Sequence, residues 1–205
     1  VSDAKTGLSV PRFEDQRFLT GSAVYADDIN IAGQLYGVVV RSTYAHAIIK
    51  NIDISAALGV AGVAAVYTET DLAADGVGHL PCSAALPPEA GLFVPPRPAL
   101  ARERVRYVGD QVAFVVADSK ENAEMAAEQV VIEYEELPAV VDAYSALQNG
   151  APQLWEDAPG NLIFRFPKGD EIARDAAFAN AKHVVELDIV NNKISAVPME
   201  PRSGI

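Results

Sequence analysis

Short apolar segments, bounded by glycine, proline or acidic residues, recur along the chain and predict β-strands. They are rich in valine and isoleucine, whose branched side chains pack well on a pleated surface. Residues 47–54 alternate isoleucines with Lys50, Asn51 and Asp53, which is typical of a strand with one face in water. Strands are expected over residues 35–41, 47–54, 63–67, 105–108, 112–117 and 131–135.

Alanine-rich segments between these strands predict helices. In the longest of them, apolar residues recur at helical spacing at Ala123, Ala126, Ala127 and Val130. Asp118 is the expected N-cap of this helix, with Glu121 reaching back to the cap. Shorter helical segments are expected at residues 55–58, at 70–71, where they would cap a turn, and at 175–181. Because the longest helix lies between two strands, residues 112–135 form a strand–helix–strand unit, and we predict an α+β (mixed α/β) fold.

Two irregular stretches interrupt this order. Residues 73–99 contain a cluster of prolines, which excludes a regular helix or a central strand over much of the stretch. A loop of this length in a compact domain usually binds something or packs on a partner. Residues 144–166 form a second irregular connection, so we place a boundary between two domains near residue 145. Beyond it, residues 183–189 alternate polar and apolar positions and predict a strand, and residues 194–197 begin another.

Composition narrows the class of protein. The chain has 205 residues, of which 50% are apolar and 21% charged, which is ordinary for a globular domain. A net charge of −12 argues against a nucleic-acid partner, since phosphate binding needs clustered Lys and Arg. The single cysteine, Cys82, excludes an internal disulfide framework and fits a reduced cytosol. With no apolar signal segment in residues 1–5 and no apolar run of roughly 20 residues, we expect a cytoplasmic protein without a transmembrane segment.

His46 is the single residue that most invites a chemical role. It follows a predicted strand, where a general base, a metal ligand or a proton shuttle could be placed. A metal would need further ligands, and the nearest histidine, His79, lies in the proline-rich stretch at a spacing without a known ligand pattern. We therefore expect the ring nitrogens of His46 to bind backbone groups at the strand end. Cys82 has no neighbouring Lys or Arg to lower its pKa, so we expect an inert thiol.

The paired carboxylates also favour a structural interpretation. Residues 27–28 and 133–136 carry adjacent acids, with Glu133 and Glu135 on the same face of a predicted strand. Acids at strand ends are normally solvated, whereas catalytic carboxylates need burial. Glu200 and Arg202 form either a surface ion pair or part of a site lining. No P-loop or dinucleotide fingerprint exists in the sequence, so we predict no catalytic, cofactor-binding or metal-binding residue in this chain.

Four motifs taken together resemble one known family. They are residues 14–21 (EDQRFLTG), 41–47 (RSTYAHA), 106–113 (RYVGDQVA) and 198–202 (PMEPR). Further similar segments are residues 51–57, 133–138 and 178–185. In this order and spacing they resemble the molybdenum-containing large subunit of carbon monoxide dehydrogenases, aldehyde oxidases and xanthine dehydrogenases. The last motif is most similar to the carbon monoxide dehydrogenase branch.

The resemblance implies a domain arrangement and a cofactor. Residues 1–17 would be an N-terminal arm, residues 18–145 an α/β hammerhead domain, and residues 146–205 a linker and the start of the first molybdopterin-binding domain. Complete members carry molybdenum on a pterin cytosine dinucleotide and take the inserted oxygen from water. Electrons leave through 2Fe-2S clusters on a small subunit to FAD on a medium subunit, commonly in a dimer of heterotrimers. The cofactor performs the redox step, and the protein positions the substrate.

The resemblance also implies what the chain lacks. The family's pterin loops and catalytic glutamate would follow residue 205, so we expect an N-terminal fragment that is inactive alone, from an enzyme hydroxylating an aldehyde, an N-heterocycle or carbon monoxide. Residues 41–47 and 199–202 are the expected neighbours of the substrate funnel. The alternatives are a freestanding, non-catalytic hammerhead module that docks to partner subunits, and an α/β domain whose function is not encoded locally.

Overall fold

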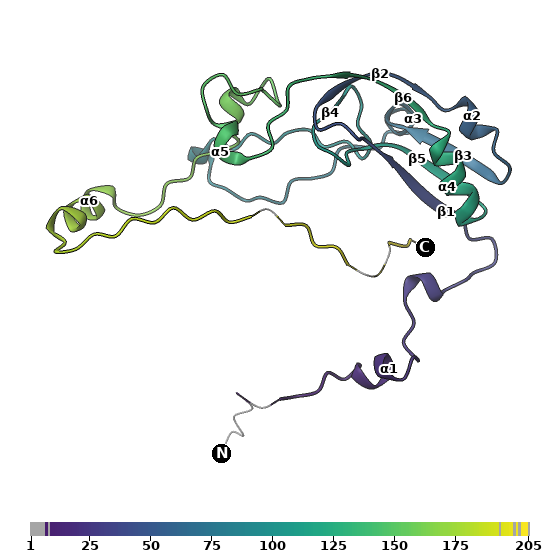
Figure 1. Ribbon diagram of the computed structural model, residues 1–205, viewed down its shortest axis with the longest axis horizontal. Helices are drawn as coiled ribbons and strands as arrows, with labels where there is room; N and C mark the ends of the chain where they lie inside the picture. Colours follow the sequence, from purple (N-terminus) through teal and green to yellow (C-terminus); the bar gives the residue numbers. More distant parts are fainter. Residues whose placement is uncertain (1–6, 8, 193, 199, 201, 205) are drawn as a thin grey trace. The chain divides into compact units, whose positions relative to one another are not determined.

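The computed structural model describes the chain apart from residues 1–6, 8, 193, 199, 201 and 205 (Figure 1). Contacts divide the chain into two compact units, and each is described by itself. The larger unit comprises residues 35–184, and the smaller one joins the residues up to 34 with those from 185 onward. This division follows contacts and does not test the domain limits of 17 and 145 inferred from sequence, which stay predictions.

The larger unit contains two antiparallel sheets of three strands each. The first has β5 (Gln111–Ala117) at its centre, with β1 (Tyr36–Arg41) and β3 (Val63–Thr68) on its two sides. The second has β2 (Ala47–Asp53) at its centre, between β4 (Arg104–Val105) and β6 (Val131–Glu136). The predicted α+β class is confirmed.

The predicted strand–helix–strand unit is present as β5, α4 and β6 in chain order, but its two strands do not pair with one another. β5 lies in the first sheet and β6 in the second, and every described strand pairing is antiparallel. The helix between them, α4 (Lys120–Glu128), packs on β1 and β5 (Figure 1). It therefore covers one face of the first sheet and does not act as a crossover within one sheet.

Alternation along β5 distributes its side chains between two cores. Val115 faces α4 and packs with Ala57, Val66 and Ala126. Ala126 is fully buried, so the helix approaches the sheet closely because only a methyl group separates them. Val112, on the other face of β5, joins the core of the second sheet. That core consists of Ala47, Ala101, Val105 and Val112, with Ile49, Ile52, Ile132 and Tyr134 packed against it.

Helical segments fill the connections. In the larger unit these are α2 (Ser55–Leu58), α3 (Glu69–Ala74), η2 (Pro88–Ala90), α5 (Ala143–Ala146), η3 (Pro159–Asn161) and α6 (Glu171–Asn180). In the smaller unit they are α1 (Asp15–Leu19) and η1 (Ala26–Asp28). No helix among the described residues is long and apolar enough to cross a membrane.

Two predicted helix caps are wrong by one or two residues. Ser119, and not Asp118, caps α4, because its side chain accepts a hydrogen bond from the Asn122 amide at 3.2 Å. The Asp118 carboxylate instead accepts from the Asn122 side chain at 2.8 Å. Thr68, and not Thr70, begins α3 in a reciprocal capping arrangement with Asp71. In both helices, the N-cap is the last residue with extended backbone angles before the helix begins. Local composition does not determine which residue that is.

Three predicted strand segments differ from the structure. The segment 105–108 pairs only as Arg104–Val105, because the Arg106 amide donates to the Asp110 side chain at 3.1 Å and the chain turns at Gly109, whose φ is +90°. Residues 183–189 form no strand, and the described residues 194–197 form none either. A strand needs a partner for its backbone groups, and the described residues offer none to either segment.

Gly62 provides the first test of the fold. Its φ is +81°, and an added Cβ would overlap the carboxylate of Asp118 and the amide of Asn122. Gly62→Ala should therefore lower the free energy of unfolding by about 1–3 kcal/mol, from backbone strain and displacement of the α4 start. Urea denaturation followed by circular dichroism measures this change. Gly78→Ala, in open space without a positive φ, is the control and should change stability little; equal effects at both sites would contradict the prediction.

Candidate functional site

The motifs at 41–47 and 106–113 meet at one end of the sheets. The Ser42 amide donates to the Asp110 carbonyl at 2.8 Å, and the Gly109 amide donates to the Ser42 carbonyl at 2.8 Å. The Arg41 guanidinium donates to the Gly109 carbonyl at 2.9 Å. These reciprocal bonds fix the loop after β1 against the loop before β5 as one junction, which we call the two-loop junction (residues 41–46 and 106–110).

Ser42 organises the first loop from within. Its side chain is only 3% exposed. The hydroxyl donates to the Tyr44 carbonyl at 3.0 Å and accepts from the Tyr44 amide at 3.0 Å, closing a tight local turn. Because both hydrogen-bonding roles of the hydroxyl are used by the Tyr44 backbone, the hydroxyl is not bonded to a side-chain base that would activate it as a nucleophile among the described residues.

Two tyrosine rings contact one another in a tilted arrangement at the junction. The rings of Tyr44 and Tyr134 lie 5.0 Å apart at a tilt of 45°. The Tyr134 hydroxyl is buried and forms no hydrogen bond with the described residues. Burial raises the pKa of Tyr134, and the nearby Ser42 hydroxyl opposes part of that rise although its own hydrogen bonds run to Tyr44. This ring contact joins the first loop to β6.

One of the two ring nitrogens of His46 binds a backbone group, as expected. It is 4% exposed, and Nδ1 lies 2.8 Å from the Pro138 carbonyl oxygen. Because a carbonyl only accepts, this contact assigns the proton to Nδ1. The Leu137 amide donates to the His46 carbonyl at 2.9 Å, which holds the end of β6 beside the ring. Nε2 is buried without a partner among the described residues, so the expectation that both nitrogens bind backbone groups is wrong for Nε2.

Arg106 binds a segment that the sequence did not connect to it. Its Nε donates to the Leu154 carbonyl at 3.0 Å, and its guanidinium lies 3.5 Å from the ring centre of Trp155. Burial and the neighbouring charge of Arg104 lower the pKa of Arg106. Phe93 completes the cluster, with its ring 6.5 Å from that of Trp155. The only sequence signal for this contact is the chain's single tryptophan in an irregular stretch.

The remaining candidates form local contacts or are exposed. Cys82 is an exposed free thiol. Asp28 accepts the Tyr25 amide at 2.9 Å and caps η1, and Glu135 forms an ion pair with Lys50 on an exposed surface. These contacts support the structural interpretation of both acidic stretches.

The C-terminal motif is described only in part. Glu200 accepts a hydrogen bond from the Ala26 amide at 3.1 Å, and no ion pair joins it to Arg202 among the described residues. Met199 and Pro201 lie outside the described residues. The expected place of residues 41–47 and 199–202 beside a substrate funnel is not tested by these contacts and stays a prediction.

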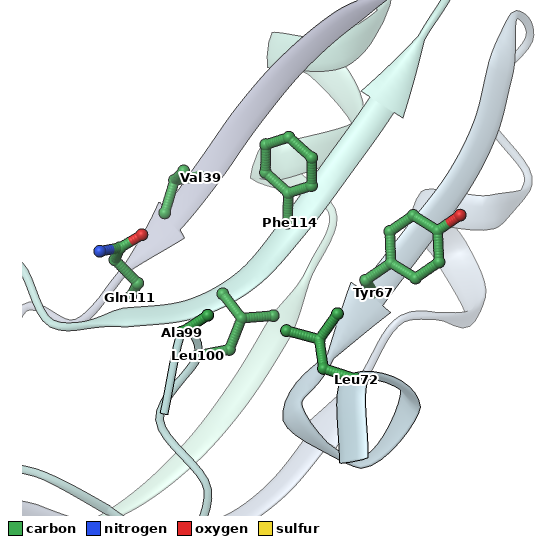
Figure 2. A pocket seen from close by; sticks show the side chains of 7 residues that line it. All are labelled: Val39, Tyr67, Leu72, Ala99, Leu100, Gln111 and Phe114. Atoms are coloured by element: carbon green, nitrogen blue, oxygen red, sulfur yellow. The ribbon is translucent and has the colours of Figure 1, made fainter. Parts of the chain in front are cut away.

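An apolar hollow of about 200 Å³ lies on the face of the first sheet opposite α4. Figure 2 shows the Leu72 and Leu100 side chains next to one another, with the Phe114 ring of β5 higher in the view. The full lining is Val39, Tyr67, Leu72, Ala99, Leu100, Gln111 and Phe114. Gly37 leaves room for the Phe114 ring, which an added Cβ would strike. Ligand pockets are usually larger, from roughly 300 Å³, and combine apolar walls with converging polar groups.

The junction therefore has the chemistry of a rigid support. Among the described residues, no group of three or more His, Cys, Asp or Glu side chains comes together that could hold a metal ion. The absence of site residues from this chain stays a prediction, because a site can also use residues of a longer polypeptide. What the geometry provides is a fixed arrangement of loops around Ser42, Tyr134 and Arg106.

A pair of substitutions tests the junction. Ser42→Ala removes both hydrogen bonds to Tyr44 and should lower the free energy of unfolding by about 1–2 kcal/mol. Tyr134→Phe removes a buried hydroxyl without a partner, so it should leave stability unchanged or raise it slightly. Thermal unfolding of the two variants decides the matter. A loss of stability in Tyr134→Phe as large as that in Ser42→Ala would show that the hydroxyl is bonded.

The sequence of this chain is similar to a known protein family and to several characterised relatives. Residues 20–138 match the family model described as "Aldehyde oxidase and xanthine dehydrogenase, a/b hammerhead domain". The chain is 41% identical to the nicotine 6-hydroxylase large subunit of Paenarthrobacter nicotinovorans over 96% of this chain and 23% of that protein. It is 37% identical to the carbon monoxide dehydrogenase large chain of Afipia carboxidovorans over 95% of this chain and 24% of that one.

A solved structure agrees with these similarities. The chain superimposes on quinoline 2-oxidoreductase from Pseudomonas putida 86 with a TM-score of 0.72 and 37% identity, covering 86% of this chain and 22% of that one. The chain thus spans about a quarter of the length of these relatives. These relatives are a hydroxylase large subunit, a dehydrogenase large chain and an oxidoreductase.

Proposed function

Because this chain belongs to the aldehyde oxidase and xanthine dehydrogenase family through its hammerhead domain, we propose that it is the N-terminal region of the large subunit of a molybdenum hydroxylase. In this role it supports a catalytic site that is completed by residues of the longer subunit. It is inactive by itself. The proposed reaction is the oxidative hydroxylation of a substrate with water as the oxygen source.

The observation that carries this proposal is the unequal coverage. At least 95% of this chain aligns with the nicotine 6-hydroxylase large subunit and the carbon monoxide dehydrogenase large chain, whereas it fills only 23–24% of their length. Fold alone does not establish an activity, since one architecture hosts many functions. Sequence identity of 37–41% over almost the whole chain is a stronger argument, because it includes both loops of the two-loop junction.

The residues of this chain do not fit the binding of the cofactor by themselves. The described residues bring together no cluster of metal-binding side chains, and the hollow of about 200 Å³ has an apolar lining. A pterin dinucleotide carries phosphates, which need backbone amides or basic side chains around them. Under the proposal, the molybdenum with its pterin cytosine dinucleotide is bound by the remainder of the subunit.

The proposal extends to the assembly. A medium subunit with FAD and a small subunit with 2Fe-2S clusters would carry electrons away, in a dimer of heterotrimers located in the cytoplasm. The relatives named as a large subunit and a large chain support an assembly of several subunits. The single cysteine of this chain cannot itself hold an iron–sulfur cluster, so this region would not supply the cluster ligands.

The substrate class is proposed as an N-heterocycle, an aldehyde or carbon monoxide. The similarity is close to equal for a nicotine hydroxylase, a quinoline oxidoreductase and a carbon monoxide dehydrogenase, so identity does not rank them. Selection among substrates depends on contacts at the reacting atoms, which this region does not supply under the proposal.

The test uses the natural gene and its neighbours. Sequencing past the codon for Ile205 should reveal an open reading frame several times longer than this region. The complete protein, purified with its partner subunits after growth with molybdate, should contain molybdenum and reduce an artificial dye with at least one of the three substrate classes. Incorporation of oxygen from labelled water into the product would identify hydroxylation. Growth with tungstate in place of molybdate is the control and should abolish dye reduction.

Two outcomes oppose the proposal. A complete protein that holds no molybdenum in molybdate-grown cells would contradict the enzyme assignment. A natural stop codon directly after this region, with a stable fold and binding to partner subunits, would instead establish the freestanding docking module.

A further inference from the structure

A tight turn shortly after α5 carries the one asparagine of the sequence that is followed by glycine, at Asn149 and Gly150. The Gln148 carbonyl accepts a hydrogen bond from the Ala151 amide at 3.1 Å, so these two residues occupy the centre of a β-turn. Gly150 has a φ of +82°, which glycine adopts at the second central position of a type II turn. Both central residues are exposed, so the turn presents an asparagine side chain and a glycine amide to water.

The reactive groups of this turn are free of other bonds. Among the described residues, the Gly150 amide donates no hydrogen bond, and the Asn149 side chain forms none either. A Cβ added at Gly150 would meet nothing within 4 Å, so no neighbouring group covers the peptide bond between the two residues. Because glycine has no Cβ, its nitrogen is also open to approach by the side chain that precedes it.

Only the tip of the turn is free to open. The Asn161 side chain donates to the carbonyls of both Ala146 and Pro152, at 2.9 Å each, and so holds the two ends of the turn. The tip is closed by the single backbone bond from Ala151 to Gln148. One such bond stabilises a structure by about 0.5–1.5 kcal/mol, so the open form should be populated on the order of ten per cent of the time. Rotation about the Cα–C bond of Asn149 in the open form brings its side-chain carbonyl to the Gly150 nitrogen.

We propose that Asn149 is a site of spontaneous deamidation. The deprotonated Gly150 nitrogen attacks the Cγ carbon of Asn149, the new C–N bond closes a succinimide ring, and the side-chain nitrogen leaves as ammonia. The proton lost by the amide returns through water to the leaving nitrogen. Water then opens the ring at either carbonyl and gives aspartate or isoaspartate. Each conversion consumes one water and releases one ammonia, with no oxidant or reductant. The inference does not depend on the proposed function, since every reacting group belongs to this chain.

Asn122 shows why an asparagine elsewhere in the fold is a poor site. Its side chain is occupied by a hydrogen bond to Asp118 at 2.8 Å. The next residue, Ala123, carries a Cβ, and its amide donates to the Ser119 carbonyl at 3.1 Å in the first turn of α4. Attack on Asn122 would therefore require the start of the helix to unwind, whereas attack on Asn149 requires the loss of one turn bond.

Peptide mapping of the intact natural protein tests the site. During incubation at neutral pH, the peptide containing Asn149 should gain about 1 Da as its amide becomes a carboxyl. It should do so at least about 10-fold faster than the peptide containing Asn122. Digestion at mildly acidic pH prevents the reaction from occurring during the mapping. A peptide with Asn149 that gains mass no faster than the one with Asn122 would overturn the inference.

The products and the pH dependence test the route. Electron-transfer fragmentation distinguishes isoaspartate from aspartate, and both should appear because the ring has two carbonyls. The rate should rise with hydroxide concentration, because the attacking amide must lose its proton. Aspartate as the sole product would contradict the succinimide, and so would a rate that is the same at neutral and mildly alkaline pH.

Two substitutions test the reacting atoms. Asn149→Gln lengthens the side chain by one methylene, so attack would need a larger ring, and this peptide should gain no mass while the parent converts. Gly150→Ala places a Cβ beside the nucleophile and should slow the conversion at least about 10-fold, although the positive φ strains alanine and favours the open turn. Conversion of the Gly150→Ala variant at the parent rate would show that the Gly150 nitrogen is not the nucleophile.

Discussion

Replacing Val115 by aspartate should unfold the larger unit of this chain. Val115 lies in the middle of β5, is fully buried, and packs with residues from α2, β3 and α4. A carboxylate at this position would have no partner, and burying an unpaired charge costs about 3–5 kcal/mol in addition to the lost packing. Since domains are stable by only about 5–15 kcal/mol, we expect loss of the far-ultraviolet circular dichroism signal of the folded state at room temperature.

Val131→Asp is the matched control for this change. Val131 is the first residue of β6 and is 56% exposed, so the same side chain can reach water there. It should lower the urea midpoint only slightly. If Val115→Asp unfolded at the same urea concentration as the parent chain, the two-core arrangement around β5 would be wrong.

Enlarging Ala126 to leucine should also destabilise the chain strongly. Ala126 is fully buried between α4 and the first sheet, in contact with the core around Val115. The added atoms would force α4 away from β1 and β5, at a cost of about 1–3 kcal/mol. Leucine is otherwise a good helix former, so the loss would come from packing and not from helix propensity.

Glu124→Leu provides the comparison on the outer face of α4. Glu124 is exposed, and leucine there should change the free energy of unfolding by less than about 0.5 kcal/mol. Urea denaturation of both variants gives the difference directly. Equal stability of the two variants would show that α4 does not pack closely on the sheet.

The family was accessible from sequence because its motifs mark the backbone junctions of the fold. The motifs at residues 41–47 and 106–113 both belong to the family pattern, and the structure joins them through Ser42, Gly109 and Asp110. The matching family model covers both motifs. Arg106 and Trp155 are 49 positions apart in the sequence. Their contact could not be predicted, because nothing in either local sequence specifies so distant a partner.

The wrong predictions of a helix cap and of a strand have a physical cause in common: both features depend on parts of the chain outside the local sequence. The sequence pattern predicts Asp118 as the cap of α4, although the Ser119 side chain accepts the hydrogen bond from the first turn. Both side chains can cap, and the choice depends on backbone angles that neighbours set. Residues 183–189 have the composition of a strand, but pairing is a property of two segments, and the described residues contain no second one.

By itself, the sequence determined the local elements of this protein and its family. Runs of β-branched residues specified the strands and alanine spacing specified α4, because side-chain shape and periodicity act over a few neighbouring residues. Only the tertiary structure decided that β5 pairs with β1 and β3 while β6 pairs with β2, and that His46 binds the carbonyl of Pro138. Those choices depend on which buried groups find hydrogen-bond partners and packing across long separations, and the energies that select them exist only once the chain is folded.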